Sequence, residues 1–196
     1  MRAPGAQRGC DAFEPPVPTD RLFLALCPDE ATAARIATLA FSECARHGLH
    51  GRPLRPDRLH VTLFHLGDWA GVSTDLVAAV GKAAGDLREA PLGVAFDTAM
   101  SFVTRGAQKP FVLKASSGNA ALHAFHARLA TSLKRNGLGE WTRGSFEPHV
   151  TLAYDRTVVP PHAIPPIGWT ACDFVLVHSL LGQTRHIPLA RWTLAS

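Results

Sequence analysis

The chain has 196 residues, of which 46% are hydrophobic and 18% charged, and its net charge is +4. This balance is typical of a globular protein and excludes a mostly disordered chain. No stretch reaches the roughly 20 apolar residues of a membrane helix, which excludes a transmembrane protein. The length allows one large domain or two small lobes.

The first 20 residues contain four prolines and lack the apolar core of a signal peptide. We therefore expect a flexible tail over 1–20 and a single domain over 21–196. The four cysteines form no CxxC pair, and Cys27 and Cys172 lie in apolar runs, which predicts buried thiols without a disulfide framework. A reduced, cytoplasmic protein is the simplest interpretation.

The charge is unevenly distributed between the two halves of the sequence. Residues 1–98 hold 10 basic and 12 acidic residues, whereas 99–196 hold 10 basic and 4 acidic residues. A basic half favours an anionic partner, with ordinary solvated surface charge as the alternative.

The order strand, helix, strand occurs twice along the chain. In each copy the helical spacing of apolar residues ends at a glycine, Gly48 in the first and Gly137 in the second, and these glycines are 89 residues apart. We infer two related strand-helix-strand lobes. The first copy comprises strand 21–27, helix 29–47 and strand 59–66, and the second comprises strand 111–115, helix 119–136 and strand 149–154.

The segments between and after the copies complete an α+β fold. Ser73 is a suitable N-cap for a helix over 73–88. Four prolines lie in 158–168, which predicts a loop there. Further strands are predicted at 92–104, 172–180 and 186–194. This order predicts a mixed or antiparallel sheet in each lobe, with the helices packed outside.

Both copies carry the tetrapeptide HVTL at matching positions. His60 and Thr62 form the polar part of the first, and His149 and Thr151 that of the second. Successive strand side chains alternate between faces, so each histidine projects on the same side as its threonine. If the lobes pack about a pseudo-two-fold axis, the two pairs face one another across a cleft.

Two opposed imidazoles suit displacement at phosphorus, where one takes a proton from the attacking oxygen and the other gives one to the leaving oxygen. The hydroxyls of Thr62 and Thr151 can donate to non-bridging oxygens. Such a reaction requires no metal and no cofactor, and it predicts a bell-shaped pH profile with both limbs near neutrality.

These motifs resemble those of the 2'-5' RNA ligase and RNA 2',3'-cyclic phosphodiesterase family, LigT-like members of the 2H phosphoesterase superfamily, which is named for two HxTx or HxSx motifs. The segments RLFLAL at 21–26, LHVTLFHLG at 59–67 and FEPHVTL at 146–152 are similar to family blocks in the same order, and the resemblance covers about residues 20–194. It implies a bilobal fold with a duplicated core and a cleft that binds an RNA end.

The resemblance also implies a reaction: hydrolysis of a 2',3'-cyclic phosphate to a 2'-phosphomonoester, with weak 2'-5' ligation as a side activity. His60 would donate a proton to the leaving 3' oxygen, and His149 would accept one from water. Because the two motifs are equivalent, residue identity alone does not fix this direction. RNA ends or nucleotides with a 2',3'-cyclic phosphate would be the partners of a monomeric enzyme.

One position departs from the family pattern. Many relatives have a basic residue shortly after the second motif, where this chain has Tyr154, which can stack on a base but cannot neutralise a phosphate. Phe102 is a second candidate for base stacking. The candidates for the missing positive charge are Arg156, Arg143, Arg58 and Lys114.

The other histidines are expected to have structural roles. His65 lies an odd number of residues from His60, so we expect it to face away from the cleft. His178 either lines the cleft or ends its strand at the surface, and packing or exposure is expected for His123 and His126. His47 and His50 have no matching cysteine or carboxylate cluster in the sequence, so no metal site is predicted.

Two other functions remain open. A non-catalytic module that binds a nucleotide or RNA end would have the same fold, because a fold does not guarantee activity. The same groups could also hydrolyse another small cyclic or 2'-5'-linked phosphodiester.

Overall fold

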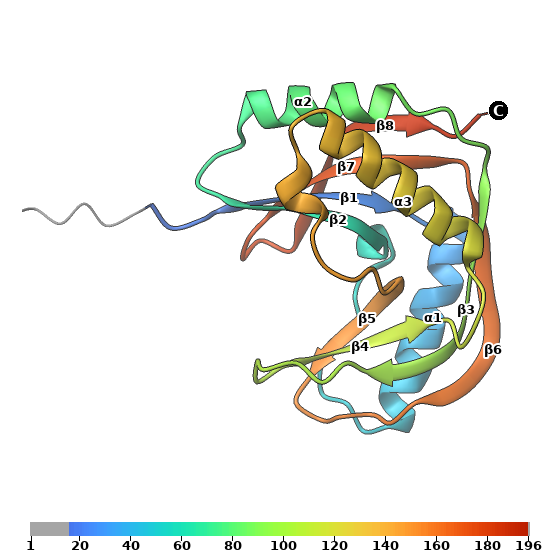
Figure 1. The fold of residues 1–196 in the computed structure, drawn as a ribbon. Helices are drawn as coiled ribbons and strands as arrows, with labels where there is room; N and C mark the ends of the chain where they lie inside the picture. The colour runs from blue at the N-terminus through green and yellow to red at the C-terminus, as the bar shows by residue number, and fades with distance from the viewer. Residues whose placement is uncertain (1–15, 196) are drawn as a thin grey trace, which may run out of the picture.

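A computed structural model describes residues 16–195, and its element order agrees with the α+β class predicted from the sequence (Figure 1). None of the helices in that range is long and apolar enough to span a membrane. The helices are α1 (Glu30–Arg46), α2 (Thr74–Gly85) and α3 (Ala120–Arg135), with short 3-10 helices η1 (Pro56–Arg58) and η2 (Gly139–Thr142). The strands are β1 (Asp20–Leu26), β2 (Val61–Trp69), β3 (Leu92–Ser101), β4 (Lys109–Lys114), β5 (His149–Asp155), β6 (His162–Ala171), β7 (Asp173–Leu180) and β8 (Arg185–Thr193).

The strands form one sheet in the order β6-β3-β4-β5-β2-β1-β7-β8, and every pair is antiparallel. Its first half, β2-β1-β7-β8, and its second half, β5-β4-β3-β6, meet where Val61 of β2 pairs with Val150 of β5. The two halves have matching strand orders outward from this junction, which confirms the predicted pseudo-two-fold arrangement. Figure 1 shows the halves diverging from the junction of β2 and β5.

The helices of the two repeats exchange places. Helix α1 follows β1 of the first half but packs against β5 and β6 of the second. Helix α3 follows β4 of the second half and contacts β3 there, but it also packs on the first half, where its Phe125 contacts Phe174 of β7 with ring centroids 5.4 Å apart. Each half therefore contributes a helix to the core of the other, which joins the predicted lobes into one body.

The signals for helix ends are confirmed. The Ser73 side chain accepts a hydrogen bond from the Leu76 amide at 3.2 Å, as an N-cap does. Gly48 and Gly137 have φ of 61° and 80°, the left-handed conformation that glycine adopts most easily after a helix.

The loop predicted from the prolines of 158–168 is wrong over its second part, where β6 begins at His162. β6 is an edge strand, and its pairing with β3 shifts register between Thr98 and Phe96, which pair with Ala163 and Ile167. Pro165 and Pro166 fall between these two pairs, inside the irregular stretch. Proline has no amide hydrogen to donate to the neighbouring strand, but the regular hydrogen bonds between β6 and β3 are interrupted at this stretch. The strand therefore tolerates both prolines.

Two expectations about the chain end and the cysteines are corrected. Asp20 begins β1 instead of ending a tail, and the Thr19 amide donates to the Trp69 carbonyl at 2.8 Å. The rest of the predicted tail, 1–15, lies outside the described residues. Cys172 is exposed instead of buried, because it lies in the turn between β6 and β7, and Cys27 is half-buried.

Candidate active site

The two HVTL motifs meet at the junction of the halves. Val61 and Val150 pair directly and are fully buried on the helix-covered face of the sheet. Because side chains alternate along a strand, the neighbouring histidines and threonines emerge on the opposite face. In an antiparallel pair of this register His60 lies across from Thr151, and His149 across from Thr62. The four polar side chains thus surround the pseudo-two-fold axis on one face.

The two imidazoles are oriented by the same contact. Nδ1 of His60 bonds to the carbonyl of Arg58 at 2.7 Å, and Nδ1 of His149 bonds to the carbonyl of Glu147, also at 2.7 Å. A carbonyl can only accept, so each Nδ1 carries the hydrogen and donates it. Nε2 of each neutral ring is then an unprotonated base, available to a substrate or, after protonation, to a leaving group.

His60 is enclosed by other rings. Phe23 of β1 stacks on it with centroids 4.8 Å apart, and His186 of β8 approaches edge-on at 5.3 Å. Burial lowers the pKa of His60 to about 4. The hydrogen bond to the Arg58 carbonyl raises this pKa, and the nearby positive charges of His149 and Arg58 lower it. The effect of His149 on this pKa agrees with the proximity that the register indicates.

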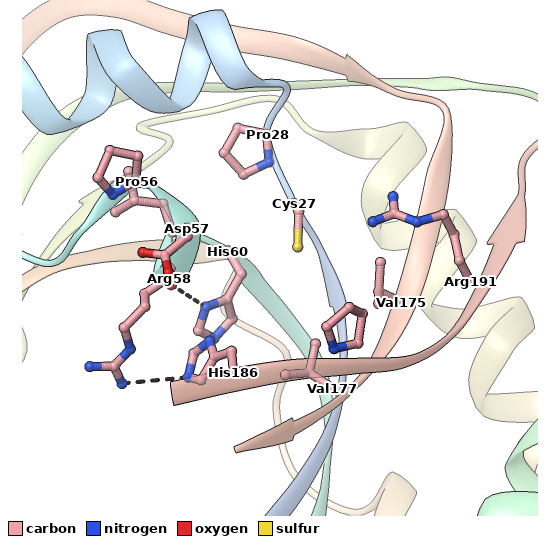
Figure 2. Close-up of a pocket in the computed structure, with 12 residues that line it drawn as sticks. Cys27, Pro28, Pro56, Asp57, Arg58, His60, Val175, Val177, His186 and Arg191 are labelled. Carbon is pink, nitrogen blue, oxygen red and sulfur yellow. Dashed lines mark hydrogen bonds between the residues drawn. The ribbon is translucent and has the colours of Figure 1, made fainter. Parts of the chain in front are cut away.

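His186 was not identified from the sequence, where it is simply the start of a predicted strand. Burial, followed by the charges of His60 and Arg58, lowers its pKa to about 4 as well. Its Nε2 lies 3.4 Å from Nη2 of Arg58, the contact drawn in Figure 2. No local motif marks His186, because pairing of β8 with β7 brings it to the site across more than 120 residues of chain.

Arg58 is the predicted cation that lies against His60. It lines a pocket of about 200 Å³ with His60, His186 and Cys27, and Arg191 stands on the opposite wall (Figure 2). The Nε atom of Arg58 is buried without a hydrogen-bond partner among the described residues. A buried guanidinium nitrogen without an acceptor is costly, and an anionic oxygen in this pocket would supply one.

The surroundings of His149 are more open. Phe102 contacts its ring edge-on with centroids 4.9 Å apart, which places this predicted aromatic residue at the site. The ring borders a second pocket, of about 420 Å³, together with Thr62 of the first motif and the predicted cation Arg143. Thr62 and His149 therefore face the same space, although they belong to different repeats.

Two matching β-bulges place further side chains on the cleft face. In β2 the register against β1 shifts between Phe64 and Thr62, and in β5 the register against β4 shifts between Ala153 and Thr151. The extra residue reverses the alternation of side chains between the two faces beyond the bulge. His65 therefore faces the pocket that Thr62 and His149 line, and the expectation that His65 faces away from the cleft is wrong. Tyr154 is the equivalent residue of the second half and is exposed.

The remaining candidate cations have other environments. Lys114 forms an ion pair with Glu147 at 2.5 Å, next to the carbonyl that orients His149. Arg156 is exposed and lies one residue beyond the end of β5. Of the four candidates, Arg58 and Arg143 thus line the pockets that contain a motif histidine.

The other histidines have packing roles. His178 lies on the helix side of β7 and bonds to Asp20 at 2.5 Å, so it does not line the cleft. His126 stacks between Phe64 and Phe146, with centroids 4.2 and 3.8 Å away. The expectation that His47 lacks a carboxylate partner is wrong, because Glu43 and His162 lie beside it.

Comparison with known proteins identifies the family of this chain. The family model of the 2'-5' RNA ligase superfamily matches residues 28–181. The chain is 30% identical over 151 residues to the RNA 2',3'-cyclic phosphodiesterase of Escherichia coli K12, a match that covers 74% of this chain and 80% of that protein. These matches place the chain among proteins of the 2H phosphoesterase type.

Solved structures extend the comparison to the whole fold. The E. coli LigT complexes with NADP+ and with 3'-AMP are both 27% identical to this chain, with TM-scores of 0.69 and 0.66, and each match covers 92% of this chain and all of the other. The protein TT0787 of Thermus thermophilus has the same fold, with a TM-score of 0.70 at 23% identity over 89% of this chain and 97% of the other. The chain belongs to the 2'-5' RNA ligase superfamily and has the LigT fold.

Proposed function

We propose that this protein is a phosphodiesterase that hydrolyses the 2',3'-cyclic phosphate of RNA ends or nucleotides to a 2'-phosphomonoester. The observation that carries the proposal is the matched orientation of two imidazoles, each held through Nδ1 by a carbonyl two residues before it, on the same face of the sheet junction. The name of the E. coli relative supports the substrate class.

The reaction uses the two Nε2 atoms in opposite roles. His149 takes a proton from water as its oxygen attacks phosphorus, and His60 gives a proton to the 3' oxygen as the P–O3' bond breaks. These roles follow the family resemblance. Thr62 and Thr151 donate to the non-bridging oxygens and stabilise the charge of the transition state. Proton transfer by such positioned groups typically contributes about 10²- to 10⁴-fold in rate.

The donor role of His60 sets a condition on substrate binding. With a pKa of about 4 the free imidazole is neutral at pH 7, so it must gain its proton together with the substrate. A cyclic phosphate carries a negative charge, and an adjacent negative charge raises the pKa of an imidazole. Substrate binding therefore raises the pKa of His60, so that the ring holds the proton that it donates. Arg58 helps to neutralise the negative charge of the phosphate.

The deciding experiment uses a short oligoribonucleotide that ends in a 2',3'-cyclic phosphate. We expect the purified protein to convert this end to a 2'-phosphate, which a 3'-phosphatase leaves intact and a general phosphatase removes. The reaction should proceed in EDTA, since neither proton transfer needs a metal. A 3'-phosphate product, or turnover that EDTA abolishes, would contradict the proposed mechanism.

A binding module without turnover is the second candidate. The lowered pKa of His60 favours a binding module, because a neutral ring is a poor proton donor. Measuring the affinity for 3'-AMP alongside turnover separates the two functions, because a module binds the nucleotide and leaves the cyclic phosphate intact. The expected monomeric state and cytoplasmic location stay predictions.

A further inference from the structure

A second cluster of functional side chains lies away from the cleft. Nε2 of His47, Nε2 of His162 and a carboxylate oxygen of Glu43 all lie within 4.8 Å of one another. Glu43 and His47 are one turn apart at the end of α1, and His162 begins β6, which packs against that helix. Figure 1 shows the C-terminal end of α1 beside the beginning of β6.

We propose that Glu43, His47 and His162 bind one divalent transition-metal ion of the Zn²⁺ class. Two imidazoles and one carboxylate are a ligand set that Zn²⁺ uses in proteins, with water in the fourth position. A single carboxylate with two nitrogen ligands does not suit Ca²⁺ or Mg²⁺, which prefer oxygen ligands.

The distances between the ligand atoms fit such an ion. Zn–N bonds of about 2.0–2.1 Å at tetrahedral angles put two ligand atoms about 3.3 Å apart. Nε2 of His47 lies 3.4 Å from Nε2 of His162 and 3.5 Å from Oε2 of Glu43. The third side, from Nε2 of His162 to Oε2 of Glu43, is a hydrogen bond of 2.6 Å, which has to open by about 0.7 Å to reach that separation when the ion enters.

The contacts around the cluster also favour metal binding. Nδ1 of His162 donates to the Pro160 carbonyl at 3.2 Å, the kind of outer contact that orients a ligating imidazole. The hydrogen through which Nε2 bonds to Glu43 has to leave when the ion binds. Arg46 is the nearest opposing charge, and its Nη1 lies 3.6 Å from Oε1 of Glu43, on the other oxygen of that carboxylate. The Oε2 atom thus remains available to the ion.

The site is separate from the catalytic face. His162 pairs with Ala99 of β3, which is fully buried in the core beneath the helices, so His162 projects on the helix side of the sheet. The side chains of His47 and His162 are 24% and 19% exposed, which gives an ion and its water access from solvent. The ion would hold the last turn of α1 to the proline-containing edge strand, a structural role.

The test is a Co²⁺ titration of the full, tag-free chain after dialysis against EDTA, followed by Zn²⁺ competition. Absorption bands of Co²⁺ at the intensity of four-coordinate sites are expected at one ion per chain. His47→Gln and His162→Gln should each weaken binding at least about 100-fold. His123→Gln, on α3, is the matched control, and His60→Ala checks that the ion does not bind at the catalytic histidines.

Thermal unfolding gives a second readout. A Zn²⁺ concentration of about 100 times the dissociation constant should raise the melting temperature by about 5 to 10 °C in the natural chain and leave that of His47→Gln unchanged. His47 is partly exposed at the end of α1, so this variant should fold even if His162→Gln does not.

Three results would overturn the proposal: no binding in excess Co²⁺ and Zn²⁺, binding that both glutamine variants retain, or binding that only His60→Ala removes. Cyclic phosphodiesterase turnover, measured in the same preparations with and without EDTA, should not depend on the ion. Failure of the metal site and failure of the proposed enzymatic function are therefore separately visible.

Discussion

His60 and His149 occupy equivalent positions in the two halves, but their surroundings differ. Both donate through Nδ1 to a carbonyl at 2.7 Å, so the duplicated backbone orients the two rings in the same way. Around His60, however, the first half places Phe23, His186 and Arg58, which bury the ring and lower its pKa to about 4. Around His149 the second half places the edge of Phe102 and a wider pocket.

The comparison teaches how a symmetric duplication can serve an asymmetric reaction. Acid/base catalysis needs one protonated and one unprotonated group in the substrate complex, so the two equivalent positions have to take different roles. Here the backbone geometry fixes where both Nε2 atoms are, and the side chains around His60 bury that ring and lower its pKa to about 4. Variants of the two rings and of their neighbours test this division of roles.

Removing either imidazole should have the largest effect. We expect His60→Ala and His149→Ala each to lower turnover of a 2',3'-cyclic nucleotide by about 10²- to 10⁴-fold, because each deletes one proton-transfer step. Initial rates, with far-UV circular dichroism to verify folding, measure this, and His123→Ala is the control. The division of roles fails if one variant keeps turnover within a few-fold of the natural chain.

The buried rings of the first half should make the protein sensitive to acid. His60 and His186 both have pKa values of about 4 in the folded chain and about 6.5 unfolded. Below pH 6.5 the unfolded chain binds protons that the folded chain excludes, so the free energy of unfolding falls until about pH 4. A shift of this size corresponds to roughly 3 kcal/mol for His60, and solvent screening makes the contribution of the half-buried His186 smaller.

Urea unfolding at a series of pH values measures this loss. His186→Gln should flatten the curve between pH 6.5 and 4, and His65→Gln, an exposed histidine of the same half, should not. A curve that His186→Gln leaves unchanged would mean that His186 is charged in the folded state.

The pKa of His60 also corrects the expectation that both limbs of the pH–rate profile lie near neutrality. Because this pKa is about 4, the limb of kcat/KM that reports His60 should lie near pH 4 in the free protein.

The phosphate charge should be neutralised mainly by the first half. Arg58→Gln is expected to raise KM for a cyclic nucleotide about 10- to 100-fold, since a charged hydrogen bond to phosphate is worth about 1.5–3 kcal/mol. Arg143→Gln, beside His149, should have a smaller effect, and Arg156→Gln almost none. If Arg143→Gln has the larger effect, the second half holds the phosphate, and the assignment of its charge to Arg58 is wrong.

Much of the fold follows from local patterns in the sequence. Ser73 caps the start of α2, and α1 and α3 each end two residues before the predicted glycine, Gly48 and Gly137. Alternation within HVTL correctly predicted that the buried valines Val61 and Val150 lie on the face opposite the motif histidines. These features depend on residues near one another in the chain, where propensity and periodicity operate.

The features that the sequence did not predict depend on tertiary pairing. The bulges that turn His65 toward the cleft are visible only in the register between strands. His186 reaches His60 through β8, and His162 reaches His47 through the pairing of β6, both across more than 100 residues. No pattern within one element encodes such contacts, which explains why the helix-side cluster was missed.

The smallest effects should come from the two residues that the bulges turn toward the cleft. His65 and Tyr154 are equivalent positions on the cleft face, one in each half, and both are exposed. Stacking of a base on such a side chain is worth about 1–3 kcal/mol where it occurs, and exposure places these residues at the lower end of that range.

Tyr154→Ala should therefore raise KM for a cyclic nucleotide about fivefold, whereas Tyr154→Phe should not, since the ring and not the hydroxyl makes the contact. A matching loss in His65→Ala would mean that the base contacts both halves, and an effect confined to one variant would show which half binds it. If Tyr154→Phe is as impaired as Tyr154→Ala, a hydrogen bond from the hydroxyl replaces stacking as the explanation.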